Sequence, residues 1–234
     1  MSHLRKEVQT VALRQRSRKY FIRGCIFLAA FLIFTIIVRF VNVEPIGPEG
    51  TSVGLAKLNG AVFNRLGGFH QGFYTLSNIL GAIVLLGGLC VALLTVIQAV
   101  HKRSIRKVNW DLKVYILYGI AVLVIYLVTE HFSINWRPVI LDAEKGLELS
   151  YPSSHTLLSI SVIGAITAQI RLRVKDAGTR HILEIGAWVL ASVTVLARFL
   201  SGVHWTTDII GSILLATALC EGYRAAVKYR YRRF

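Results

Sequence analysis

A histidine and an aspartate lie four residues apart in the stretch RFLSGVHWTTD, residues 198–208, between two strongly apolar runs. Residues i and i+4 share one face of a helix, so His204 and Asp208 would be neighbours there. A carboxylate bonded to one ring nitrogen leaves a lone pair on the other, which makes the histidine a nucleophile or a base. A helix cap or a structural hydrogen bond is the alternative interpretation of this pair.

A second polar stretch, YPSSHT, covers residues 151–156. It is typical of a helix start, because Pro152 limits what precedes it and serines such as Ser153 and Ser154 suit the cap position. The amides of a first helical turn point outward at the positive end of the helix dipole and can bind an anion. His155 lies within this turn. A plain helix cap without any ligand is the alternative.

Two arginines next to apolar runs complete the set, Arg137 in NWRP and Arg198. A guanidinium is a fork-shaped donor that suits phosphate, although either arginine alone could be an interfacial anchor. Ionisable residues at membrane depth are functional candidates. The combination of two arginines, a serine-rich helix start with a histidine and a His-Asp pair predicts a site for an anion, most simply phosphate.

The elements that must position these residues are apolar. Hydrophobic residues make up 54% of the 234-residue chain and charged residues 17%, whereas soluble domains carry roughly 25% charged residues. Several apolar stretches approach the roughly 20 residues that cross a bilayer. The sequence predicts an all-α integral membrane protein, a bundle of six transmembrane helices. The predicted spans are 23–41, 73–100, 112–129, 155–170, 182–200 and 205–223.

This bundle forms a single predicted membrane domain, 23–224, between a basic segment, 1–22, and a basic tail, 225–234. The apolar run after residue 22 is too long for the core of a signal peptide, and no small-residue cleavage site follows it. We therefore expect a retained first helix.

Lysine and arginine are concentrated in four separated segments. Residues 1–23, 101–113, 171–181 and 222–234 carry seven, five, four and five of the 27 basic residues. By the positive-inside rule these segments and both termini are cytoplasmic, and the three motifs share the outer face. The net charge of +15 then reflects topology and not nucleic-acid binding. We expect a multi-pass protein of a bacterial plasma membrane, with the lipid bilayer as its partner and the oligomeric state left open.

Two smaller patterns carry less weight. Leu55, Leu58, Val62 and Leu66 recur at helical spacing in the first outer loop, which predicts a short helix, either in the membrane interface or packed as an ordinary loop helix. The three cysteines lie in apolar stretches without metal-ligand spacing, so we interpret them as packing residues and not as a disulfide framework or a zinc site.

Taken together, the motifs resemble those of the type 2 phosphatidic-acid phosphatase family, membrane lipid phosphatases related to the vanadium haloperoxidases. The third family motif is an arginine, five residues, a histidine, three residues and an aspartate, and Arg198, His204 and Asp208 match it fully. The second motif, Pro-Ser-Gly-His, matches residues 152–155 except that Ser154 replaces the glycine.

The first family motif, a lysine, six residues and Arg-Pro, matches at Arg137 and Pro138 but has Glu130 at the lysine position. An anion there would weaken phosphate binding unless it points elsewhere. Lys145 or His131, from the same outer region, are candidates to compensate. Ser154 adds a side chain where the backbone approaches the ligand.

The resemblance implies phosphatase activity with no metal and no other cofactor. It assigns His204 as the nucleophile that forms a phosphohistidine, Asp208 as its orienting partner, and His155 as the acid that protonates the leaving lipid oxygen. Phosphoryl transfer needs positioning and charge stabilisation above all, which fits these residue types. The phosphate oxygens would be held by Arg137, Arg198, Ser153 and the amide of Ser154.

The leading hypothesis is therefore a lipid phosphate phosphatase that acts at the outer face on a phosphomonoester or a pyrophosphate. Candidate substrates are phosphatidic acid, phosphatidylglycerol phosphate and undecaprenyl pyrophosphate. One alternative is a lipid phosphotransferase of the same chemistry, which passes the phosphoryl group to an acceptor other than water. The other is a catalytically weakened protein that binds or transports lipid phosphates.

Overall fold

The computed structural model describes residues 2–129, 131 and 134–230, with side chains described within these ranges from residue 15 to residue 229. The prediction at Glu130 lies outside the described residues.

Within the described residues, the only extended pairings are two isolated β-bridges, Glu44 with Val53 and Trp136 with Leu149. The helices are α1 (Ser2–Phe40), η1 (Pro48–Gly50), α2 (Ala56–Arg65), α3 (Gln71–His101), η2 (Ile105–Lys107), α4 (Trp110–Thr129), α5 (Ser154–Arg173), α6 (Ala177–Leu200) and α7 (Thr206–Arg230).

Six of these helices, all except α2, η1 and η2, are long and apolar enough to cross a membrane. The predicted all-α bundle with six membrane-spanning helices is thus confirmed. The first helix is longer than predicted, because α1 begins at Ser2 and runs through the basic segment assigned to 1–22. That segment contains no glycine or proline and many good helix formers, so nothing in it ends a helix.

Helices α5 and α7 form the centre of the bundle. About half of the apolar window of each is buried, 50% and 56%, against 11% for α1. Small residues allow the two helices to approach closely, as is common between helices in membranes. A Cβ atom at Gly164 of α5 would lie 2.2 Å from the Cys220 sulfur of α7, so a larger residue there would force the Cys220 side chain to move.

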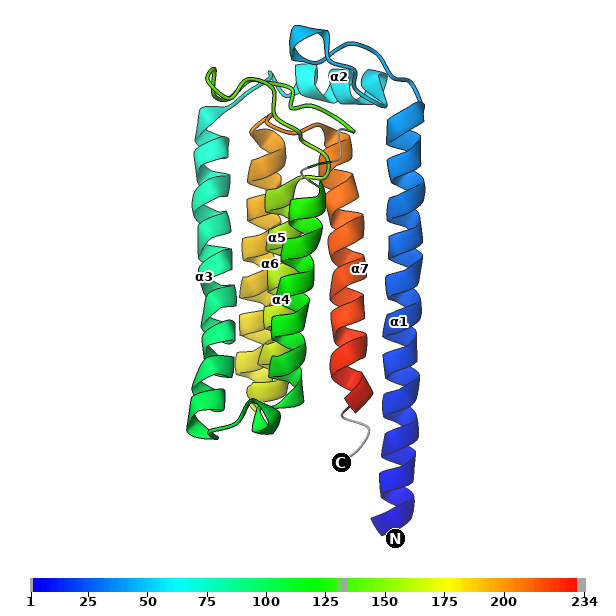
Figure 1. The fold of residues 1–234 in the computed structure, drawn as a ribbon, viewed down its shortest axis with the longest axis vertical. Coiled ribbons are helices and arrows are strands. Elements are labelled where there is room, and N and C mark those ends of the chain that lie inside the picture. The colour runs from blue at the N-terminus through cyan, green and yellow to red at the C-terminus, as the bar shows by residue number, and fades with distance from the viewer. Residues whose placement is uncertain (1, 130, 132–133, 231–234) are drawn as a thin grey trace.

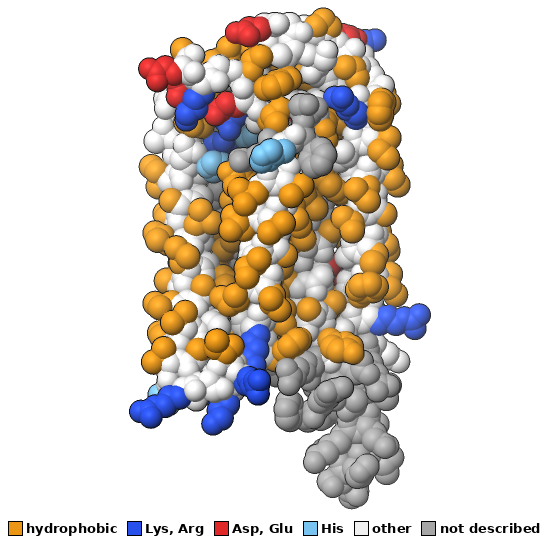
Figure 2. Space-filling model, viewed as in Figure 1, with side chains coloured by type: hydrophobic (Ala, Val, Ile, Leu, Met, Phe, Trp, Pro, Cys, Tyr) orange, Lys and Arg blue, Asp and Glu red, His pale blue; other side chains and the backbone are white. Residues whose placement is uncertain are grey.

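Both termini lie at one end of the bundle, and α2 lies across the other end together with the loops that carry the three motifs (Figure 1). Figure 2 shows apolar side chains covering the middle of one face, basic side chains at the end with the termini, and acidic, basic and histidine side chains together near the end with α2. We call the latter the site end. The six crossings bring all three motifs to this one end.

Candidate active site

The predicted site residues come from four elements at the site end. Arg137 lies in the loop between α4 and α5, and His155 lies in the first turn of α5. Arg198 lies in the last turn of α6, and His204 lies in the short turn that precedes α7. The positive charges of both arginines act on both histidines, so the four side chains are within electrostatic range of one another.

Five buried polar atoms of these motifs have no hydrogen-bond partner. Nine buried side-chain nitrogen and oxygen atoms lack a partner in the described part of the chain, and more than half of them belong to the predicted site. Buried polar groups are normally hydrogen-bonded, so such a concentration calls for an explanation. The atoms are Arg137 Nε, Ser153 Oγ, His155 Nδ1, Arg198 Nε and His204 Nε2. The two arginine Nε atoms and the Ser153 hydroxyl are hydrogen-bond donors, as binding of an anion requires.

Ser153 occupies the N-cap position of α5, but its side chain makes no cap hydrogen bond. It is fully buried, and its backbone amide donates to the Asp208 carbonyl at 3.2 Å. The Ser153 hydroxyl therefore remains available, unlike that of an ordinary capping serine. Ser154 is the first residue of α5, where the amides of the first turn have no partner within the helix.

The imidazole of His204 is held through its Nδ1 atom. This nitrogen lies 3.1 Å from the Ser150 carbonyl oxygen and 3.6 Å from Asp208 Oδ2. Because a carbonyl oxygen only accepts, Nδ1 carries the proton and the lone pair is on Nε2. Burial, and then the charges of Arg198 and Arg137, hold the pKa of His204 well below its usual value. The result is a neutral imidazole with a free lone pair at Nε2.

His204 and Asp208 lie close together, as expected, but they are not on one helix. His204 lies outside α7, which begins at Thr206, so the two residues do not share a helix face. Asp208 Oδ2 instead accepts a hydrogen bond from the Trp205 amide at 2.9 Å, which caps the start of α7. Asp208 is therefore both a helix cap and the nearest carboxylate to His204.

Helix α3 holds Arg198 in place through residues that lie outside the three motifs and were not predicted. The Nη1 atom of Arg198 donates to Asn78 Oδ1 at 3.1 Å and to Ser77 Oγ at 3.4 Å. The guanidinium carbon lies 5.2 Å from the centre of the Tyr74 ring, a cation–π contact. The signal in the sequence was a polar cluster, YTLSN, at the start of an otherwise apolar span.

Arg137 has an acidic partner that was not predicted from the sequence. Glu148 Oε2 lies 3.3 Å from Arg137 Nε, in a geometry that makes an ion pair but no hydrogen bond. The Glu148 carbonyl also accepts from the Arg137 amide at 2.9 Å. Lys145 is exposed and pairs with Asp142 at 3.7 Å, so it does not take the place of the missing motif lysine.

Gly202 shapes the turn between α6 and α7 that carries His204. Its φ is +69°, and a Cβ atom there would lie 2.2 Å from the Gly68 carbonyl oxygen. Both the left-handed backbone and the close approach require glycine. The turn thus packs directly on the segment before α3.

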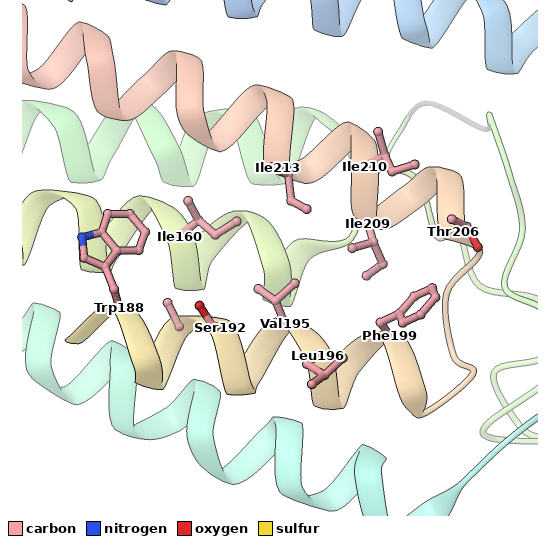
Figure 3. Close-up of a pocket in the computed structure, with 11 residues that line it drawn as sticks. Ile160, Trp188, Ser192, Val195, Leu196, Phe199, Thr206, Ile209, Ile210 and Ile213 are labelled. Atoms are coloured by element: carbon pink, nitrogen blue, oxygen red, sulfur yellow. The ribbon is translucent and has the colours of Figure 1, made fainter. Parts of the chain in front are cut away.

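An apolar groove of about 460 Å³ lies between α6 and α7, with Ile160 of α5 in its wall. In Figure 3, Trp188 lies at one end of the groove, and Phe199 and Thr206 lie at the other. Phe199 follows Arg198 in the chain, so the groove extends along the membrane-spanning part of α6 up to the level of the site. A second apolar cavity, of about 470 Å³, lies among α3, α4 and α5.

The fold and the site define a multi-pass membrane protein of six spanning helices with a polar, anion-ready cluster at one end. The family model of the PAP2 superfamily matches residues 112–232, about half of the chain, and the chain belongs to this family. The predicted family resemblance is thus confirmed.

One solved structure shows the same fold: the crystal structure of the first transmembrane PAP2 type phosphatidylglycerolphosphate phosphatase from Bacillus subtilis. The similarity covers 87% of this chain and 94% of that one, with a TM-score of 0.56 and 19% sequence identity. No curated protein matches this chain.

Proposed function

We propose that this protein is a membrane lipid phosphate phosphatase that works through a phosphohistidine at His204. The observation that supports this most is the set of five buried, unpartnered polar atoms on the three motifs. A bound phosphate group would supply acceptor oxygens to Arg137, Arg198 and Ser153, and an electrophilic phosphorus to His204. Membership in the PAP2 superfamily supports the same reaction class.

In the first step, the lone pair of His204 Nε2 attacks phosphorus. The new P–N bond forms as the bond from phosphorus to the lipid oxygen breaks, and His155, which enters this step as the imidazolium, donates a proton to that oxygen and becomes neutral. The arginine forks and the first turn of α5 stabilise the charge that spreads over the three remaining phosphate oxygens. The neutral state of His204 follows from its lowered pKa, which leaves the nucleophile unprotonated.

In the second step, His155, now deprotonated, accepts a proton from a water molecule as the water oxygen attacks phosphorus. The P–N bond breaks, inorganic phosphate leaves, and both histidines return to their starting state. His204 is thus the nucleophile, and His155 acts first as the acid and then as the base. No step needs a metal ion.

A lipid is the substrate that suits the surroundings of the site. The groove between α6 and α7 and the cavity among α3, α4 and α5 are apolar and lie within the spanning helices. We propose three lipids as the first substrates to test: phosphatidic acid, phosphatidylglycerol phosphate and undecaprenyl pyrophosphate. The Bacillus subtilis protein of the same fold is itself named a phosphatidylglycerolphosphate phosphatase.

The site end faces the extracytoplasmic side of a plasma membrane in this proposal. Four basic segments alternate with the loops of the site end along the sequence, as the positive-inside rule requires. Single cysteines introduced at Lys145 and at Lys107 test the orientation in intact cells. A membrane-impermeant thiol reagent should label the former and spare the latter, and the reverse pattern would overturn the orientation.

The activity is tested with purified protein in detergent micelles, each lipid phosphate in turn, and excess chelator. We expect phosphate release from at least one lipid without added metal, and none from the His204→Ala variant. Strict dependence on an added metal ion, or equal release by His204→Ala, would contradict the mechanism.

A further inference from the structure

We propose that Asn135 is a positioning residue that sets the orientation of His204 by fixing both groups that contact its Nδ1 atom. This inference rests on the proposed function, because orientation matters only if His204 is the nucleophile. Asn135 lies two residues before Arg137 and is fully buried. It lies within the first motif stretch, NWRP, but at a position whose residue type the family motif does not specify.

The first group is Ser150, whose carbonyl accepts from His204 Nδ1. Two hydrogen bonds hold Ser150 to Asn135: its amide donates to the Asn135 carbonyl at 3.0 Å, and its hydroxyl donates to the same oxygen at 3.2 Å. The position of the acceptor for His204 is therefore set by the backbone of Asn135.

The second group is Asp208, the nearest carboxylate to His204. Asn135 Nδ2 donates to Asp208 Oδ1 at 3.1 Å and to Thr207 Oγ1 at 3.2 Å. Asn135 Oδ1 accepts from the Gly54 amide at 3.1 Å. The side chain thus uses both its amide hydrogens and its oxygen, which fixes the direction of the amide group.

Both contacts of His204 Nδ1 are consequently one hydrogen bond away from the same residue. The contacts of Nδ1 fix the orientation of the imidazole ring, and this orientation sets the direction of the free Nε2 atom. Phosphoryl transfer depends on an in-line approach of the nucleophile. Misplacing a reacting group by about 1 Å can cost roughly 100-fold in rate. Losing the Asn135 side chain removes the bond to Asp208 directly. It also removes the side-chain bonds to Thr207 and Gly54 that fix Asn135, so the backbone carbonyl that holds Ser150 is held less firmly. The substitution should therefore lower kcat more than it changes substrate binding.

Asn59 provides a matched control. It is also buried, and its side chain also bonds Gly54 and Thr207, with Nδ2 donating to the Gly54 carbonyl at 2.8 Å and to Thr207 Oγ1 at 2.9 Å. Its Oδ1 accepts from the Thr207 amide at 3.2 Å. None of these bonds reaches Ser150 or Asp208. Asn59→Ala thus disturbs the same corner of the fold without touching the partners of His204.

The experiment compares wild type, Asn135→Ala, Asn135→Asp, Asn59→Ala and His204→Ala with a lipid phosphate that the wild type hydrolyses. We expect Asn135→Ala to lower kcat by about 10- to 100-fold with KM within about threefold of wild type. Asn59→Ala should lower the unfolding temperature about as much as Asn135→Ala does, but its kcat should stay within about threefold of wild type.

Asn135→Asp preserves shape and keeps the acceptor for Gly54, so it covers the case in which the alanine variant does not fold. It loses the donor to Asp208 and places two carboxylates against each other, so kcat should again fall. Equal kcat values for the Asn135 and Asn59 variants, or a raised KM with unchanged kcat, would overturn the proposal. If His204→Ala is as active as wild type, the proposed function fails and the role of Asn135 fails with it.

Discussion

His204 donates its Nδ1 hydrogen to the backbone carbonyl of Ser150, at 3.1 Å, and not to the carboxylate of the family motif. Asp208 lies farther away, at 3.6 Å, and its nearer bonds go to the Trp205 amide and to Asn135. The ring is thus oriented mainly by a backbone group, and the aspartate adds an electrostatic contact and a helix cap.

Replacing Asp208 should therefore damage the protein in two ways that can be measured separately. Asp208→Ala removes the cap at the start of α7, which should destabilise the protein by about 1 kcal/mol. It should lower kcat as well, but less than His204→Ala does, because Ser150 still fixes the tautomer. Thermal unfolding and steady-state kinetics check the two effects. Equal kcat values for Asp208→Ala and His204→Ala would show that the Ser150 bond does not suffice.

Glu148 should compete with the substrate for Arg137. Its carboxylate lies 3.3 Å from Arg137 Nε, where a phosphate oxygen would bind in the proposed reaction. Because partly exposed ion pairs contribute up to about 1 kcal/mol, Glu148→Gln should lower KM by about two- to fivefold. Inhibition by inorganic phosphate should become stronger by a similar factor.

Asp142→Asn is the control for this change, because it removes one negative charge from the same loop without touching Arg137. Asp142 pairs with the exposed Lys145 instead. We expect its KM to match wild type. If Glu148→Gln raises KM, then Glu148 holds Arg137 in position for the substrate and does not compete with it.

Asn78 should affect phosphate binding through Arg198. Its Oδ1 accepts from Arg198 Nη1 at 3.1 Å, and hydrogen bonds to charged groups contribute about 1.5–3 kcal/mol. Asn78→Ala should raise KM by roughly 10-fold, with a smaller change in kcat. Asn78→Asp should restore the contact as an ion pair and bring KM back toward wild type. A loss of thermal stability with unchanged KM would contradict the assignment.

The pH profile should report the lowered pKa of His204. A nucleophilic imidazole must be neutral, so activity falls as pH drops through the folded-state pKa. Because burial and the two arginines lower that pKa, the acid limb of kcat/KM should lie well below the usual value near 6.5. Arg137→Gln removes one of these positive charges and should move the limb to higher pH.

Comparing the two profiles with the same lipid separates this effect from titration of the substrate, since phosphate monoesters themselves titrate near pH 6. Identical acid limbs in wild type and Arg137→Gln would show that His204 does not control the profile.

The spanning helices and the motif residues could be predicted from the sequence because both rest on local patterns. A bilayer demands about 20 apolar residues for each crossing, and the third motif has fixed spacing. Alternation of the six crossings also places Arg137, His155 and His204 at the same end. The positions of the helix ends were harder to predict. The basic residues before residue 23, for example, belong to α1.

The contacts that hold the site could not be predicted, because they join residues far apart in the sequence. The Ser150 carbonyl is a backbone group that no residue type marks. Asn59 and Thr207 are 148 residues apart, and Asn78 and Arg198 are 120 apart. His204 and Asp208 lie close together as expected, but the helical spacing did not show that α7 begins only at Thr206, which leaves His204 in the turn before it.

Phosphorylation of His204 can be detected by rapid quenching of the reaction with a ³²P-labelled lipid phosphate. We expect a protein-bound label in the wild type that is labile to acid and stable to base, as a phosphohistidine is. This label should map to the peptide that contains His204. His204→Ala should bind the lipid and acquire no label. His204 is not the nucleophile if the wild-type enzyme releases phosphate in a single turnover without any labelled protein, or if the His204→Ala variant is still labelled.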